Sequence, residues 1–283
     1  MASGECPLLA ARSGRRPGSV VKIWYQSAVE ISGARPYRDA LQRHFERVAE
    51  PGTQVELFGV DPGTWAGRQP SQLFGYPAIF HAALGPAFLR NAVRSEREGY
   101  DAFIIGTYIE PYLRELRSAV DIPVISSFEA MLLVGCSVAH TIGVVTLNRQ
   151  LLWSLKISLE RHRLTPRVGA MLVMEPELNE REIVELLSAP GAYLDRFIDT
   201  ARRAVADHAD AIIPAEGILA ELLAANGITS VDGAAVLDGI GIPVAYAQML
   251  AKLWRTTGLR VGRHWHQLLP PTDLVDLFVS RLP

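Results

Sequence analysis

The chain has little of several features that would assign it to a class at once. Its 283 residues include two cysteines, Cys6 and Cys136, which argues against a disulfide scaffold and a cysteine-rich metal site. It has no uninterrupted apolar run of about 18 residues, so we predict no membrane-spanning helix. Its 28 lysines and arginines nearly balance 30 aspartates and glutamates. With a formal net charge of −2, the chain has no positive excess that would favour nucleic acid or an anionic membrane as a partner.

Several signature motifs are also missing. The sequence has no Walker loop, no G-x-G-x-x-G after a strand and no G-x-S-x-G elbow. His264 and His266 are two residues apart, but no third ligand stands at a zinc-like spacing, so we expect no metal site. In residues 1–20 the basic cluster follows a short apolar patch, the reverse of a secretory signal. We expect a flexible N-terminal extension over these residues and a cytoplasmic protein.

What the sequence does contain is a regular alternation of strand and helix patterns. Residues 62–86 break the alternation with an irregular stretch rich in glycine, proline and aromatic residues. The predicted strands are 20–25, 53–60, 102–107, 122–126, 141–147, 167–174, 209–215 and 242–246, and the predicted helices are 37–48, 86–98, 112–120, 128–139, 149–163, 179–208, 217–226 and 248–257. Such alternation predicts an α/β fold with parallel sheets covered by helices on both faces.

In parallel α/β sheets, ligands bind beyond the carboxyl ends of the strands. The residues at these ends are therefore the first candidates for a site. They are Gln26, Ser27, Thr107, Tyr108, Ser126, Ser127, Thr146 and Glu216. Ser126 and Ser127 are better explained as caps of the helix that follows them.

A weak internal repeat relates two of these strand ends. Both 101–124 and 210–244 begin with Asp-Ala and an apolar strand, continue through a turn and a helix, and reach Ile-Pro-Val. Duplicated halves usually pack as two similar lobes with a cleft between them. The repeat therefore predicts that the turns at 107 and 216 face each other.

The segments that carry these features resemble the aspartate/glutamate/hydantoin racemase superfamily. The resemblance covers about residues 20–257 and is clearest in DAFIIGTYIEP (101–111), IPVISSFEAM (122–131), GVVT (143–146), ADAIIPAEGI (209–218) and GIPV (241–244). It implies two Rossmann-like lobes with parallel sheets and an active site in the cleft between them. It also implies catalysis by two cysteines, one on each face of the substrate carbon, without a cofactor. We place the first lobe at 21–120 plus 228–283 and the second lobe at 121–227.

The chain departs from the family at both catalytic positions. Thr107 stands where the first cysteine is expected, followed by the family's acidic-proline step at Glu110 and Pro111, and Glu216 replaces the second cysteine. Racemisation needs a base on one face of the carbon and an acid on the other, exchanging roles. A threonine hydroxyl is no base near neutral pH, but it can donate a hydrogen bond or attack with the help of a base. Glu216 is either that base or merely the cap of the helix it precedes.

We therefore predict a cofactor-independent enzyme acting on a small carboxylate or cyclic amide. Glu216 would be the base and Thr107 the opposing hydroxyl, in one-sided chemistry of a hydrolase or lyase. Two alternatives stay open: a true racemase or isomerase with an unusual acid/base pair, and a catalytically silent protein that binds a small ligand. The resemblance further implies a homo-oligomer, and substrate contacts from Gln26, Ser27, Tyr108 and Thr146.

Overall fold

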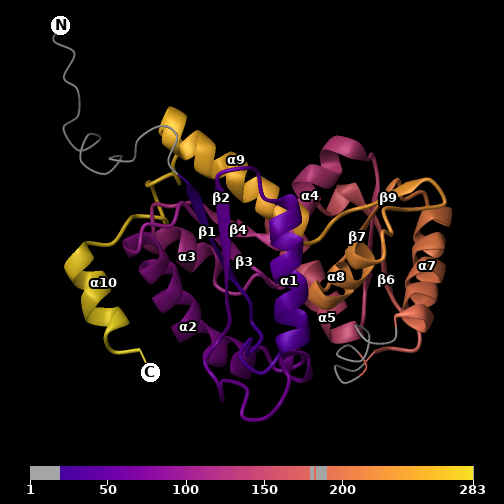
Figure 1. Ribbon diagram of the computed structural model, residues 1–283, viewed down its shortest axis with the longest axis horizontal. Helices are drawn as coiled ribbons and strands as arrows, with labels where there is room; N and C mark the ends of the chain where they lie inside the picture. Colours follow the sequence, from indigo (N-terminus) through magenta and orange to yellow (C-terminus); the bar gives the residue numbers. More distant parts are fainter. Residues whose placement is uncertain (1–19, 179–181, 183–189, 283) are drawn as a thin grey trace, which may run out of the picture.

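The computed structural model describes residues 20–178, 182 and 190–282. Two α/β lobes lie side by side, each built on its own sheet (Figure 1). The sheet of the first lobe has the strand order β2-β1-β3-β4 and all of its pairs are parallel. Its strands are β1 Val21–Gln26, β2 Thr53–Phe58, β3 Ala102–Ile105 and β4 Val124–Ser126.

The sheet of the second lobe has the order β6-β5-β7-β9-β8. Its pairs are parallel except for the antiparallel pair of β8 and β9 at one edge. Its strands are β5 Ile142–Thr146, β6 Val168–Val173, β7 Ala211–Pro214, β8 Ser230–Val231 and β9 Ala234–Val236. The predicted α/β fold with two lobes of mainly parallel strands is thus confirmed.

The helices cover both faces of the sheets, as the alternation predicts. They are α1 Arg35–Val48, α2 Pro77–Arg97, α3 Leu113–Ala119, α4 Ser127–Val138, α5 Arg149–His162, α7 Gly191–Ala206, α8 Gly217–Ala225, α9 Gly241–Thr257 and α10 Thr272–Val279. Short 3-10 helices are formed by Pro70–Leu73 and Thr165–Arg167. In β1, Ile23 and Tyr25 pack with α1 and α9, while Trp24 packs with α2 on the other face. This is the two-residue period of a strand buried on both faces.

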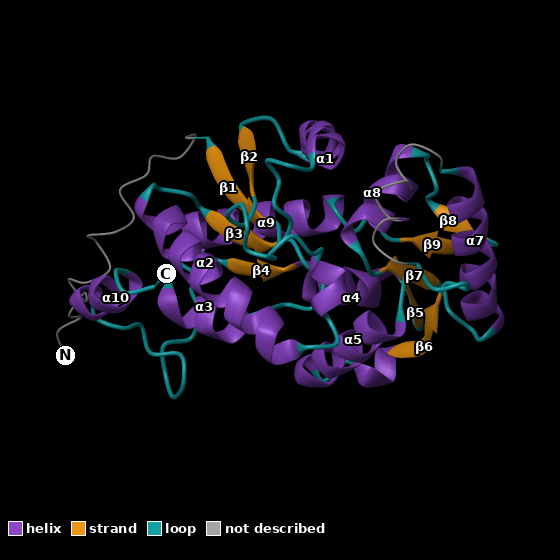
Figure 2. Ribbon diagram, turned by 90° about the horizontal axis from the view of Figure 1, so that it is seen from below, coloured by secondary structure: helices purple, strands orange, loops and turns teal. Residues whose placement is uncertain are grey.

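Two helices connect the lobes. Helix α4 follows β4 of the first sheet and leads into β5 of the second, and it lies between the two sheets (Figure 2). Helix α9 returns from the second sheet and packs against β1, β3 and β4 of the first. In the described part of the chain, no helix combines the length and the apolar character needed to span a membrane.

Sheet membership corrects the predicted lobe boundaries. Strand β4, placed in the second lobe from sequence, pairs with β3 of the first sheet. Strands β8 and β9, placed in the first lobe, pair with each other and with β7 of the second sheet. The chain therefore crosses to the second lobe through α4 and returns through α9. Apart from Val20, the predicted N-terminal extension lies outside the described residues.

Several predicted elements also change. Residues 242–246 form the first turns of α9 and are not a strand, so the two Ile-Pro-Val landmarks of the repeat are not structurally equivalent. Helix α2 begins at Pro77, inside the stretch predicted to be irregular. Of the predicted helix at 179–208, the structure describes Gly191–Ala206 as α7, and most of 179–189 lies outside the described residues.

Candidate active site

A small cavity lies where the carboxyl ends of strands from the two sheets meet. It measures about 60 Å³. Residues following β1, β3, β5 and β7 contribute to it, together with the start of α8 and the 3-10 helix at Pro70–Leu73. The lining residues are Ser27, Ala28, Val29, Tyr37, Pro70, Ser71, Phe74, Gly106, Thr107, Tyr108, Leu147, Asn148, Leu151, Glu216, Gly217 and Ile218. The two turns that the internal repeat predicts to face each other thus line one cavity.

Glu216 both lines this cavity and caps a helix. Its backbone is extended, with φ −160° and ψ 142°, and its Oε2 accepts a hydrogen bond of 2.8 Å from the backbone N–H of Leu219. A carboxylate at this position is stabilised by the unpaired N–H groups and the dipole of α8. The capping explanation considered from sequence is therefore correct, and it does not remove the carboxylate from the cavity wall.

Thr107 lies across the cavity in the turn after β3. Its side chain is partly exposed, and its hydroxyl makes no hydrogen bond to any described residue. The turn is held close to the first sheet by Gly106, because a Cβ at that position would overlap the ring of Tyr25. Thr107 can therefore offer its hydroxyl to a ligand without breaking an existing hydrogen bond.

Two buried tyrosines complete the polar wall. The hydroxyl of Tyr108 donates to the carbonyl of Gly239 at 3.1 Å, and the hydroxyl of Tyr37 lies over Gly217 at the start of α8. Burial, reinforced by the nearby Glu216 carboxylate, holds the pKa of both phenols well above the usual 10. Both tyrosines therefore remain protonated at neutral pH.

Ser27 and Asn148 follow β1 and β5. Ser27 Oγ accepts from the backbone N–H of Val29 at 3.1 Å. Asn148 caps α5, since its Oδ1 accepts from the N–H of Leu151 at 2.8 Å, while its amide donor has no partner among the described residues. Neither Asn148 nor Tyr37 was singled out from sequence. The strand-end rule could have found Asn148, which is the second residue after β5.

Gln26 and Thr146 are not among the residues that line the cavity, and their roles as substrate contacts stay predictions from sequence. Gln26 is fully buried, and its amide group is engaged on both atoms. Its Oε1 accepts from Trp24 Nε1 at 3.0 Å and Asn91 Nδ2 at 2.9 Å, and its Nε2 donates to the carbonyls of Ser27 and Gly59. It therefore fixes the loop that carries Ser27.

Thr146 is also fully buried, and its hydroxyl points toward the neighbouring strand end. It donates a long hydrogen bond of 3.4 Å to the carbonyl of Ala215, the residue before Glu216. Its contact therefore supports the turn that carries the candidate base.

A buried group of charges outside the cavity joins the two lobes. His44 of α1 is fully buried and contacts Glu221 of α8 through Nδ1 at 2.6 Å and Asp238, before α9, through Nε2 at 2.9 Å. Burial alone would lower the pKa of His44, but hydrogen bonds to Asp238 and Glu221 outweigh it and raise this pKa to about 9. Tyr25 packs nearby, and its pKa is raised by burial and by Glu221.

A second group of charges joins the lobes on another side. His162 of α5 contacts Glu110 through Nε2 at 2.7 Å and Glu129 of α4 through Nδ1 at 3.4 Å. Hydrogen bonds to Glu110 and Glu129 overcome the effect of burial and raise the pKa of His162 to about 9. Glu129 also pairs with Arg117, and Ser126 donates to Glu110.

Glu110, named in the sequence analysis only as part of the acidic-proline step with Pro111, thus also contacts His162 of the other lobe. The predicted capping of α4 is confirmed, because Ser126 Oγ accepts from the N–H of Glu129 at 3.0 Å. Neither group of charges was predicted from sequence.

No cysteine is among the described residues that line this cavity. Cys136 is partly buried in α4 and is not among the lining residues, and Cys6 lies outside the described residues. Within the described part of the chain, no cluster of three or more His, Cys, Asp or Glu side chains has a geometry that could hold a metal ion.

Comparison with known proteins gives the family. The Asp/Glu/Hydantoin racemase family matches residues 80–247, more than half of the chain. A hydantoin racemase of Pseudomonas sp. (strain NS671) is 26% identical over 178 residues, which are 61% of this chain and 67% of that protein.

Solved structures agree on the fold. The allantoin racemase from Klebsiella pneumoniae superposes with a TM-score of 0.70 at 19% identity, covering 89% of this chain and 94% of that one. The allantoin racemase from Pseudomonas fluorescens gives a TM-score of 0.63 at 19% identity, covering 88% and 97%. The chain therefore belongs to the Asp/Glu/hydantoin racemase family, with Thr107 and Glu216 at the turns where the resemblance places cysteines.

Proposed function

We propose that the protein is an enzyme that acts on a small cyclic amide or carboxylate by one-sided general-base chemistry. Glu216 would be the base, and the Thr107 hydroxyl would donate a hydrogen bond from the opposite wall. One observation carries the proposal. Among the described residues that line the cavity, Glu216 alone can accept a proton at neutral pH, since Tyr37 and Tyr108 remain protonated and the other polar groups are hydroxyls and an amide.

The substrate class follows from the other polar groups on the wall. The Thr107 hydroxyl and the Asn148 amide have unused donors, and the start of α8 contributes backbone N–H groups. Donors of this kind suit the carbonyl oxygens of a ring amide or a carboxylate. The names of the related hydantoin and allantoin racemases favour a five-membered cyclic amide, because allantoin is itself a substituted hydantoin.

For hydrolysis, Glu216 would take a proton from water as the resulting hydroxide adds to a ring carbonyl. The Thr107 hydroxyl would donate to the oxygen that becomes negatively charged. Collapse of this intermediate would break the ring C–N bond, and the departing nitrogen would receive the proton from Glu216. In a lyase, Glu216 would instead take a proton from the carbon beside the carbonyl, and the electron pair would expel a neighbouring group.

Racemisation is the second candidate, because the named relatives are racemases. It would begin with the same proton removal by Glu216 and would require return of a proton to the opposite face. Tyr37 or Tyr108 could donate that proton. In the reverse direction the same tyrosine would have to act as a phenolate base and remove a proton from the substrate carbon, and its raised pKa opposes formation of the phenolate. One-sided chemistry is therefore the first candidate.

The test is a panel of 5-methylhydantoin, allantoin, 5,5-dimethylhydantoin, aspartate and glutamate, followed by proton NMR in D₂O and by chiral chromatography. Hydrolysis would open the ring and would include 5,5-dimethylhydantoin, which has no hydrogen at C5. A lyase would release a new unsaturated product. A racemase would exchange the C5 hydrogen and lose optical activity without a new compound.

The matched variant is E216Q, which keeps the shape and removes the base. General-base catalysis is typically worth about 10²–10⁴-fold, so the turnover number of E216Q should fall by that order. A variant that reacts at the wild-type rate would refute the proposal and leave Glu216 as a helix cap. If wild type and E216Q bind a panel member equally and neither converts it, the protein is the silent binder.

A further inference from the structure

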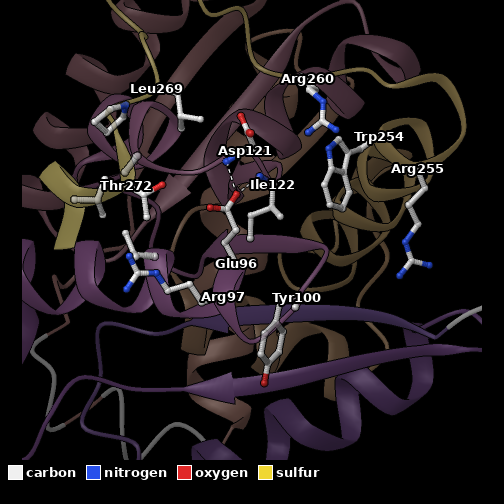
Figure 3. A pocket seen from close by; sticks show the side chains of 15 residues that line it. Glu96, Arg97, Tyr100, Asp121, Ile122, Trp254, Arg255, Arg260, Leu269 and Thr272 are labelled. Carbon is white, nitrogen blue, oxygen red and sulfur yellow. Dashed lines mark hydrogen bonds between the residues drawn. The ribbon is translucent and has the colours of Figure 1, made fainter. Parts of the chain in front are cut away.

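A second and larger cavity lies at the amino-terminal edge of the first sheet, opposite to the edge that carries Thr107. It has a volume of about 350 Å³, within the range of roughly 300–1,000 Å³ typical of small-molecule sites. It is bounded by α2, by the residues that precede β3 and β4, by the end of α9 and by the C-terminal segment through α10 (Figure 3). It shares no lining residue with the cavity between the lobes.

Much of the wall of this cavity is apolar. Val93 of α2, Ile122 before β4, Trp254 of α9, and Leu269 and Val275 of the C-terminal segment line it. They come from segments far apart in the sequence, so the cavity exists only because the C-terminal segment folds back on the first lobe. Such a wall suits a ligand with an apolar body.

Two of the three arginines in the wall are paired with carboxylates. Arg97 forms an ion pair with Asp276 of α10, and Arg255 with the fully buried Asp101 at 2.6 Å. Arg260 forms no ion pair with any described residue. Its guanidinium lies 5.5 Å from the ring centroid of Trp254, at cation–π distance.

The carboxylates in the wall are also engaged. Glu96 Oε1 accepts from the backbone N–H of Asp121 at 2.6 Å and of Ile122 at 3.3 Å. Asp121 forms an ion pair with Arg263 at 3.0 Å. Glu96 and Asp121 therefore have partners other than Arg260. Their negative charges in the cavity wall also repel a multiply charged anion.

A second donor lies beside Arg260. The indole Nε1 of Trp254 is buried and has no hydrogen-bond partner among the described residues. Figure 3 places this nitrogen and the Arg260 guanidinium at the same end of the cavity, away from Tyr100. A buried donor without an acceptor is destabilising, so a ligand acceptor that reaches this nitrogen would be favoured.

We propose that this cavity is a binding site for a small molecule with an apolar body and one carboxylate. The carboxylate accepts from Trp254 Nε1 and pairs with Arg260, and the apolar body packs against Ile122, Val93 and Val275. A neutral ligand would leave Arg260 unpaired. A phosphate dianion would face Glu96 and Asp121 across the cavity.

The test uses isothermal titration calorimetry of the full-length protein with 4-phenylbutyrate, octanoate and indole-3-acetate. The neutral 4-phenylbutan-1-ol serves as the matched ligand control. At least one of the carboxylates should bind, and it should bind at least tenfold more tightly than the alcohol.

R260Q removes the charge and should weaken binding about tenfold or more. W254F keeps an aromatic ring, removes the N–H donor and should weaken binding several-fold. R43Q, at an exposed arginine of α1 outside the cavity, and E216Q, in the other cavity, should bind like wild type. Circular dichroism of each variant checks that the fold is retained.

The proposal is overturned if none of the three carboxylates binds at up to about 10 mM, a weak affinity on the usual scale. It is also overturned if folded R260Q and W254F both bind like wild type. Loss of binding in E216Q with retention in R260Q would assign the ligand to the cavity between the lobes. These results do not depend on the reaction catalysed there.

Discussion

The buried contact of His44 with Glu221 and Asp238 predicts a specific dependence of stability on pH. His44 has a pKa of about 9 in the folded protein, against 6.5 ordinarily. Because the folded-state pKa is raised, the contact contributes fully below about pH 6.5, and its contribution is lost as the pH rises through 9. Linkage between these two values gives a contribution to the free energy of unfolding of roughly 2–3 kcal/mol at pH 7 and well under about 1 kcal/mol at pH 9.

The perturbation is the double variant H44Q/E221Q, which removes the titrating group and avoids leaving Glu221 buried with an unpaired charge. Asp238 keeps its backbone hydrogen bonds from Ile240 and Gly241, at 3.0 and 2.8 Å. Between pH 7 and 9, the free energy of unfolding of wild type should fall by about 2 kcal/mol more than that of the variant. The remaining fall in the variant includes His162, whose pKa is also about 9.

The assay is urea unfolding followed by circular dichroism at fixed ionic strength, at half-unit steps from pH 6 to 9. H266Q is the control, because His266 is exposed and outside both buried groups of charges. It should follow the wild-type curve. Parallel curves for wild type and H44Q/E221Q would refute the reasoning, since they would mean that His44 binds no more protons in the folded state than in the unfolded state.

Three further outcomes follow from the site. T107V should lower the turnover number at least tenfold, and T107S should keep most of it, because the hydroxyl is the proposed donor. Equal activity of T107V and wild type in steady-state assays would remove Thr107 from the mechanism. Replacing both cysteines by alanine should leave turnover within a few-fold, and a thiol alkylator that inactivates wild type but not this variant would contradict the proposed site. G239A should lower turnover about tenfold or more, because its Cβ would overlap the Tyr108 hydroxyl and displace the neighbouring turn. G262A, where a Cβ meets open space, is its matched control, and equal kcat values would show that the turn tolerates the displacement.

The sequence predicted the two sheets well because most of their strands are apolar runs with polar turns after them. It failed at 242–246, where Ile242, Val244 and Pro243 suggested a strand. Proline is tolerated in the first turn of a helix, and that is where Pro243 stands in α9. Strands β8 and β9 have two and three residues, too short to produce a periodic pattern.

Within the site, one feature separates the predicted residues that line the cavity from those that do not. Ser27, Thr107 and Glu216 lie beyond the last residue of a strand and reach the cavity, whereas Gln26 and Thr146 are still paired in their sheets. A side chain inside a strand points to a face of the sheet, so Gln26 lies on the same face as Trp24 and contacts it. A difference of one position relative to the end of a strand, as between Gln26 and Ser27, thus separates a buried support from a cavity residue.

The two groups of charges could not be predicted because their members are distant in the sequence. His44 lies 177 positions from Glu221 and 194 from Asp238. In the local sequence around each of these residues, nothing distinguishes it from an ordinary polar residue of a helix or a turn. Only the packing of α1 against α8 and α9 brings them together.

The two groups of charges also limit how the lobes can move. A cavity of about 60 Å³ must widen to admit a substituted ring. Breaking a buried charged contact costs several kcal/mol, and the lobes are joined by one such group at His44 and another at His162. The His44 and His162 groups are therefore two charged points of attachment between the lobes, and a widening of the cavity that breaks neither contact is energetically favoured over one that breaks either.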